Sequence, residues 1–181
     1  MGSSSSRRQR AAEERAARKL EREPIVLAFD YDPNNLRYHG PVITTGLTIT
    51  EAHRNALITA GRPVPPPVAC RFLIDTGADG CVVKHDIAIR AGLKLINANS
   101  PIAGVGVDTT GKTYIGRVLF GVESKVVAGA KIQVFVDTQV MSGDLNTNIL
   151  DGLIGRDVLQ HFTLNYDGQS GRVTMRYHRP R

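Results

Sequence analysis

A short polar segment directly follows a run of apolar residues near the middle of the chain. Residues 72–74 are Phe, Leu and Ile, and Asp75, Thr76 and Gly77 come next. A carboxylate at the end of a buried strand is costly to remove from water. The glycine lets the backbone turn tightly and brings amide N–H groups close to the carboxylate. The pattern therefore predicts that Asp75 is held at the end of a strand, where it could act as an acid or a base.

One such carboxylate is a poor catalyst of hydrolysis, but two that face each other form an effective pair. Two adjacent carboxyl groups cannot both ionise easily, so one keeps the proton and the other acts as the base. The ionised group could activate a water while the protonated group donates to the scissile carbonyl. A symmetric homodimer brings two copies of one motif together, because both subunits use the same surface. We therefore expect Asp75 to meet Asp75 of a second chain.

A second motif follows the first at a distance of about 80 residues. Residues 73–79 read LIDTGAD, and residues 153–159 read LIGRDVL. Each runs from apolar residues into a glycine turn, which suggests two half-units related by a pseudo-twofold axis. The pair resembles the motifs of the retropepsins, the retroviral-type aspartic proteases and their single-domain bacterial relatives. The resemblance covers roughly residues 38–177 and leaves out residues 1–24.

The resemblance implies a fold, an activity and a set of partners. The fold is a small, closed, barrel-like all-β domain with one or two short helices, active as a homodimer. The activity is that of an aspartic endopeptidase, which cleaves peptide bonds in extended peptide or protein substrates, usually between bulky apolar side chains. The resemblance implies neither a metal nor another cofactor.

The resemblance also implies roles for individual residues. Asp75 is the catalytic aspartate, Thr76 hydrogen-bonds across the dimer axis, and Gly77 contacts the substrate backbone. Asp79 and Arg156 form an ion pair that braces the active-site loop. The residues expected on the substrate side are the loop residues Ala78 and Asp79, the tip of a flap hairpin at Gly104, Val105 and Gly106, and the apolar pocket walls Leu153 and Ile154. Ala78 stands where pepsin-type enzymes more often carry Ser, which stabilises ionised Asp, so we expect activity at milder pH than pepsin's.

Simpler interpretations exist for each of these features. Residues 75–77 could be an Asp-initiated turn after a strand, and Asp79 and Arg156 an incidental surface pair of little energetic value. Gly104 and Gly106 could mark an ordinary hairpin turn. The domain could also be a catalytically silent dimerisation or peptide-binding module, because a fold does not guarantee a function. Residues 7–23 could instead be a propeptide or anchor that is removed by autoprocessing.

Composition limits the class of protein. The 181 residues suggest one domain, residues 25–181, behind a flexible basic tail, residues 1–24. The chain has a net charge of +6. Its basic residues are not interleaved with aromatic ones, so we expect no nucleic-acid partner. No signal segment or apolar run long enough to span a membrane is seen, so we expect a cytoplasmic protein in which Cys70 and Cys81 need not form a disulfide. The histidines lack the spacing of metal ligands and are interpreted as structural or exposed: His39, His53, His85, His161 and His178.

The elements that must position Asp75 are mostly short strands. Apolar and β-branched runs predict strands over 25–29, 42–49, 68–75, 81–83, 113–121, 131–136, 153–154, 164–166 and 172–177. Helices are expected over 7–23, after the N-cap candidate Thr50 over 51–60, over 86–91 with Gly92 ending it, and over 157–162. Residues 32–35 are expected to be a turn, and residues 1–6 a flexible leader.

Overall fold

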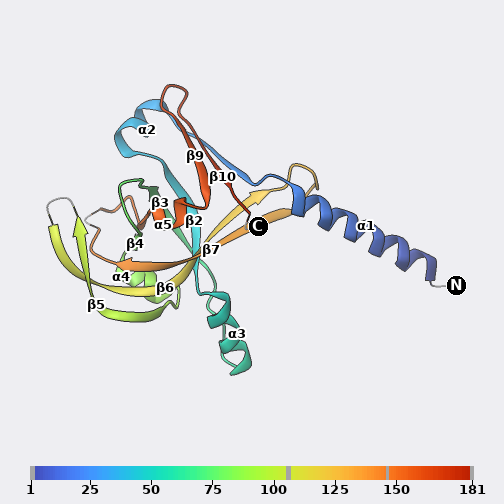
Figure 1. The fold of residues 1–181 in the computed structure, drawn as a ribbon, viewed down its shortest axis with the longest axis horizontal. Coiled ribbons are helices and arrows are strands. Elements are labelled where there is room, and N and C mark those ends of the chain that lie inside the picture. The colour runs from blue at the N-terminus through green and yellow to red at the C-terminus, as the bar shows by residue number, and fades with distance from the viewer. Residues whose placement is uncertain (1–2, 105–106, 146, 180–181) are drawn as a thin grey trace.

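Six strands close into a β-barrel within a single chain. The computed structural model describes residues 3–104, 107–145 and 147–179 (Figure 1). Around the barrel each strand hydrogen-bonds to the next, and the last returns to the first. In order these strands are β2 (Val42–Thr48), β3 (Val68–Ile74), β8 (Gly152–Ile154), β4 (Cys81–Val83), β7 (Lys131–Ser142) and β6 (Val107–Glu123). The mostly β, barrel-like architecture expected from the sequence is confirmed.

The pairing of β8 joins the two sequence motifs. β8 lies parallel to β3, with Leu73 opposite Leu153, and antiparallel to β4, with Val82 opposite Leu153. β4 in turn pairs with β7 in parallel. The ring closes through β2 and β6, where Leu47 lies opposite Val118. The loop that follows β3 is therefore adjacent to the turn that follows β8.

Four more strands lie outside the closed ring, one on the barrel sheet and three in a second sheet. β5 (Lys94–Gly104) forms a long antiparallel hairpin with β6, in which Gly104 pairs with Val107. The expected flap-tip residues Val105 and Gly106 lie outside the described residues. The terminal strands form a separate antiparallel sheet in the order β1 (Val26–Asp30), β10 (Arg172–Tyr177) and β9 (Phe162–Asp167).

The core follows from alternating burial along the strands. In β3, Cys70, Phe72 and Ile74 are buried while Leu73 is only partly so, as expected for successive side chains on opposite faces of a strand. The rings of Phe120 and Phe162 meet edge to face with centroids 5.1 Å apart. This contact packs the terminal sheet against the barrel.

The domain has more helix than the one or two short helices expected. Within the described part of residues 25–181 there are four: α2 (Pro33–His39), α3 (Glu51–Thr59), α4 (His85–Arg90) and α5 (Arg156–Leu159). Thr50 caps α3 as expected, and Gly92, at φ 67°, follows α4 in the left-handed conformation that glycine tolerates.

The expectation of a simple turn at residues 32–35 was wrong, because these residues begin α2. The side chain of Asp32 accepts hydrogen bonds from the amides of Asn34 and Asn35 at 3.0 and 3.1 Å, and Pro33 is the first helical residue. These are signals of a helix start as much as of a turn. Leu36 is only 1% exposed, and burial of its side chain favours a helix over a simple turn here.

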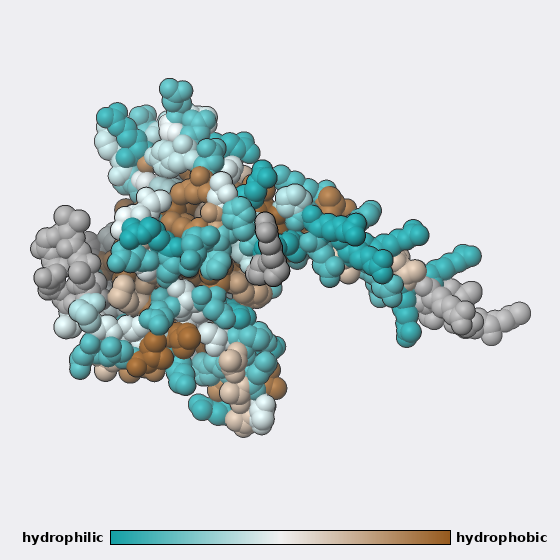
Figure 2. All heavy atoms as spheres, viewed as in Figure 1, coloured by the Kyte–Doolittle hydropathy of each residue, from teal (hydrophilic) through white to brown (hydrophobic). Residues whose placement is uncertain are grey.

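Helix α1 (Ser3–Arg22) projects away from the rest of the molecule (Figure 1). It begins at Ser3, so residues 3–6 are helical rather than the flexible leader expected. Most of its described side chains are exposed, and Figure 2 shows a largely hydrophilic surface along it. None of the helices in the described part of the chain is long and apolar enough to cross a membrane.

Candidate active site

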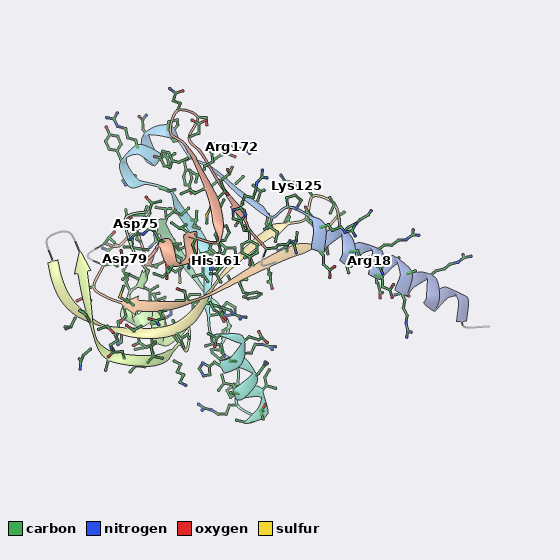
Figure 3. All side chains as sticks on the ribbon, viewed as in Figure 1. Arg18, Asp75, Asp79, Lys125, His161 and Arg172 are labelled. Carbon is green, nitrogen blue, oxygen red and sulfur yellow. The ribbon has the colours of Figure 1, made fainter. Side chains whose placement is uncertain are left out.

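Asp75 is the first residue after β3, at the edge of the core. The strand itself is held by its neighbours, and the amide of Asp75 donates to the carbonyl of Ile154 at 3.0 Å. This bond continues the parallel pairing of β3 and β8 by one residue. Whereas Ile74 is buried, Asp75 is partly exposed. The carboxylate therefore sits on a rigid strand end where solvent can reach it (Figure 3).

The residues after Asp75 form a tight turn around its carboxylate. The amide of Gly77 donates to Asp75 Oδ1 at 2.8 Å, and the amide of Ala78 donates to the Asp75 carbonyl at 3.3 Å. Thr76 and Gly77 are exposed at the tip of this turn. A hydrogen bond from an aspartate to the amide two residues on is common in turns. The turn alone therefore does not distinguish a catalytic aspartate from an ordinary one.

Arg156, the first residue of α5, braces this turn although it lies 80 residues from Thr76 in the sequence. Its Nη1 donates to the carbonyls of Thr76 and Gly77 at 2.9 and 3.0 Å, and its Nη2 donates to Asp79 Oδ1 at 2.7 Å. The ion pair with Asp79 is present as expected from the sequence, although an exposed pair contributes little by itself. The two carbonyl contacts make Arg156 more than an incidental surface partner, because they fix the backbone of the tip itself.

Backbone contacts lock α5 onto the same loop. The amides of Arg156 and Asp157 donate to the carbonyls of Ala78 and Asp79 at 2.9 and 3.1 Å. Gly155 makes this possible, because a Cβ there would lie 2.4 Å from the carbonyl oxygen of Gly80. A side chain at position 155 would therefore keep the two chain segments from approaching so closely, whereas a Cβ at Gly80 would meet its nearest neighbour only at 3.7 Å.

Asp157 is a site residue that sequence reasoning missed. Its carboxylate accepts from the amides of Cys81 at 3.0 Å and of Val158 at 2.9 Å, and from the hydroxyl of Thr138. It thereby ties the end of the Asp75 loop to β7 and α5. The available signal was an acidic residue at the start of a helix within an apolar motif, where a carboxylate finds free amide donors.

The two cysteines are buried and free, and their thiols are inert. Burial raises the pKa of Cys70 to about 12. Burial also raises the pKa of Cys81, and the neighbouring carboxylate of Asp157 raises it further. Because the thiolate is the reactive form, neither side chain is a nucleophile near neutral pH.

The expected substrate-side residues differ in their accessibility. Leu153 is partly exposed, whereas Ile154 is fully buried in the core, so only Leu153 can contact a ligand without rearrangement. Ala78 is partly exposed and Asp79 is exposed, both in the braced loop. Gly104 ends β5 and pairs with Val107 of β6, and its expected role at the tip of a flap stays a prediction.

A network around His85 anchors the base of that hairpin. Nδ1 of His85 lies 3.2 Å from Ser142 Oγ and 3.2 Å from the Tyr114 hydroxyl, and Nε2 lies 3.3 Å from Lys112 Nζ. These contacts join α4 to β6 and β7 beside a cavity of about 530 Å³. The network supports the interpretation of His85 as a structural residue.

The loop contains two accessible carboxylates, and only that of Asp75 is not bound by a guanidinium group. Asp79 is paired with Arg156, whereas the described residues form no ion pair with Asp75. In the part of the chain that the structure describes, no group of three or more His, Cys, Asp or Glu side chains could hold a metal ion.

No protein-family model matches this chain, and no curated protein matches it.

Proposed function

We propose that this protein is an aspartic endopeptidase whose catalytic pair consists of Asp75 from each of two identical chains. The observation that carries the proposal is the placement of Asp75. Its carboxylate is accessible at the end of a buried strand, in a loop whose backbone Arg156 holds through Thr76 and Gly77. Positioning to within a fraction of an ångström is what acid–base catalysis demands of its groups.

The need for a second chain follows from the chemistry. Hydrolysis of a peptide bond requires a base to take a proton from water and an acid to donate one to the scissile carbonyl oxygen. Asp75 can fill one of these roles at a time. Thr76 and Gly77 are exposed at the tip of the turn, so a twofold axis beside this tip would bring the two carboxylates together. One shared proton would then give the pair both roles.

The resemblance to the retropepsins supports the same proposal. The two motifs that carry this resemblance, LIDTGAD and LIGRDVL, lie far apart in the sequence. The parallel pairing of β3 with β8 brings them side by side in this chain. The retropepsin fold would place an extended peptide between the loop of Asp75 and the β5–β6 hairpin. The partly exposed Leu153 would then contact an apolar side chain of the substrate.

Cleavage of a peptide library, read by mass spectrometry, tests the proposal. Wild type is expected to cleave, and Asp75→Asn is expected to lose at least about a hundredfold in rate, because general acid–base catalysis contributes that much or more. Asp86→Asn is the matched control, since Asp86 is exposed on α4 and paired only with Arg90 in the same helix. It should cleave like wild type.

Mixing the two chains tests the shared pair. An excess of the Asp75→Asn chain should lower wild-type cleavage, because mixed dimers contain only one aspartate. Cleavage by a strictly monomeric wild type would overturn the dyad. Peptide binding without any cleavage by wild type would instead favour the silent binding module.

A further inference from the structure

A groove far from Asp75 separates α1 from the turn between β6 and β7. The turn, residues 124–130, reaches the C-terminal end of α1 (Figure 1). Figure 3 shows Arg18 on α1 and Lys125 in the turn, both well apart from Asp75. Two adjoining cavities of about 660 and 630 Å³ lie between helix and turn, and both are lined by Arg18, Lys19 and Val126. They form one elongated groove.

The groove is built on a fixed frame. The buried side chain of Glu23 accepts hydrogen bonds from Ser124 Oγ and from the amide of Lys125, each at 2.6 Å. The guanidinium of Arg179 donates to the carbonyls of Leu20 and Glu23 at 2.8 and 3.1 Å. These four bonds hold the end of α1 against the turn, so the two walls keep a defined separation.

The helix wall of the groove is cationic. Arg15, Arg18, Lys19 and Arg22 all line one or other cavity and are all exposed. Their spacing of three, four and seven residues places them on one face of the helix. Glu23 is the one carboxylate among the lining residues, and its oxygens already bind Ser124 and Lys125.

The floor and the opposite wall are apolar. Ala12 and Ala16 line the groove from α1, and Val126, Val127 and Ala128 line it from the turn. Val126 is 52% exposed, and Figure 2 shows a small hydrophobic area beside the base of α1. The groove therefore sets a short apolar strip opposite a row of positive charges.

We infer that this groove binds an acidic peptide segment of another protein, one that alternates carboxylates with apolar side chains. The carboxylates pair with the four cations of α1, and the apolar side chains cover Val126 and its neighbours. A nucleic-acid backbone would satisfy the cations but leave the apolar strip exposed. A bilayer would need an apolar helix face turned outwards, whereas Ala12 and Ala16 face the turn.

Fluorescence anisotropy with the full chain carrying Asp75→Asn tests the inference. That background prevents cleavage by the proposed dyad, so the binding result is independent of whether the chain is a peptidase. The probe is a short fluorescein-labelled peptide in which pairs of Glu alternate with pairs of Leu. Matched peptides replace Glu by Gln or Leu by Ser. The Glu–Leu peptide should bind, and each matched peptide should bind at least about tenfold more weakly.

Variants of the groove locate the binding. Arg15→Glu combined with Lys19→Glu should weaken binding by roughly tenfold or more, since two attractive charges become repulsive. Glu preserves helix propensity, and circular dichroism checks that α1 remains helical. Val126→Ser, which leaves the helix untouched, should weaken binding about threefold or more, because it removes an apolar contact. Arg62→Glu is the control, an exposed arginine outside the groove, and should bind as before.

Three outcomes would overturn the inference. The first is failure of the Glu–Leu peptide to bind. The second is binding that the groove variants leave unchanged, which would place the peptide elsewhere. The third is equal or tighter binding of a DNA duplex or of phosphatidylserine vesicles that is insensitive to Val126→Ser, because the groove would then be only a patch of positive charge.

Discussion

At the scale of single residues, the Asp75 loop depends on Asp157 as much as on the motif that contains Asp75. Arg156 contacts the tip of the loop from an exposed position, whereas Asp157 reaches the amide of Cys81 at its end. A buried amide that loses its acceptor is costly, because it has also lost water. The geometry at Asp75 is therefore maintained by a carboxylate that itself takes no part in the proposed reaction.

Removing that carboxylate should loosen the loop. We expect Asp157→Ala to lower the free energy of unfolding by about 2–4 kcal/mol, because the Cys81 amide and the Thr138 hydroxyl both lose an acceptor. Asp157→Asn keeps one acceptor oxygen and should lose less. Urea unfolding measures both, with exposed Asp86→Ala as a control that should stay within about 0.5 kcal/mol of wild type. Equal stability of Asp157→Ala and wild type would contradict this role.

At the scale of elements, the carboxylate of Glu23 is, with the guanidinium of Arg179, one of two side chains that attach α1 to the rest of the chain. Hydrogen bonds from Ser124 and from the amide of Lys125 lower the pKa of Glu23. A group whose pKa is lower in the folded state stabilises that state at pH values above its unfolded pKa. The stabilisation is lost as pH falls through the lowered value. The attachment of α1 should therefore be complete near neutral pH and weaken only in acid, below the ordinary glutamate pKa of about 4.3.

Hydrogen–deuterium exchange of the α1 amides tests this attachment. At neutral pH, Glu23→Ala should speed exchange over residues 15–22, because the helix loses its contact with the turn. Glu21→Ala, an exposed glutamate in the same helix, should not. Wild type should reach similarly fast exchange, after correction for intrinsic rates, when acidified below the glutamate range. Unchanged protection in Glu23→Ala would show that Arg179 alone holds the helix.

At the scale of the whole molecule, folding and the proposed catalysis have different requirements. The barrel closes through β2 and β6 within one chain, and its core is buried without a partner. The proposed catalytic pair, by contrast, needs two chains. A folded but inactive single chain should therefore exist.

Dilution separates these two requirements. Specific peptidase activity should fall on dilution, because dimers dissociate by mass action. The far-ultraviolet circular dichroism of the same samples should not change, because each chain keeps its barrel. Analytical ultracentrifugation at matched concentrations identifies the species present. Loss of the folded signal together with the activity would instead show that the chain cannot fold alone.

Local preferences were sufficient to predict many of the elements. Alternating apolar residues predicted β3 and β10 nearly to their ends, and Thr50 and Gly92 marked a helix start and a helix stop as expected. Residues 32–35 show where local signals are ambiguous. An Asp-Pro-Asn-Asn sequence suits a turn or a helix start equally, and burial of Leu36 decided for the helix.

The sequence by itself determined that Asp75 ends a strand and enters a glycine turn, because those preferences lie within a few neighbouring residues. Only the tertiary structure decided which distant groups complete the site. The contacts of Arg156 and Asp157 with the Asp75 loop, the closure of β2 on β6, and the attachment of α1 through Glu23 all join residues far apart in the sequence. Such contacts depend on the register of the whole barrel, and no short stretch of sequence encodes that register.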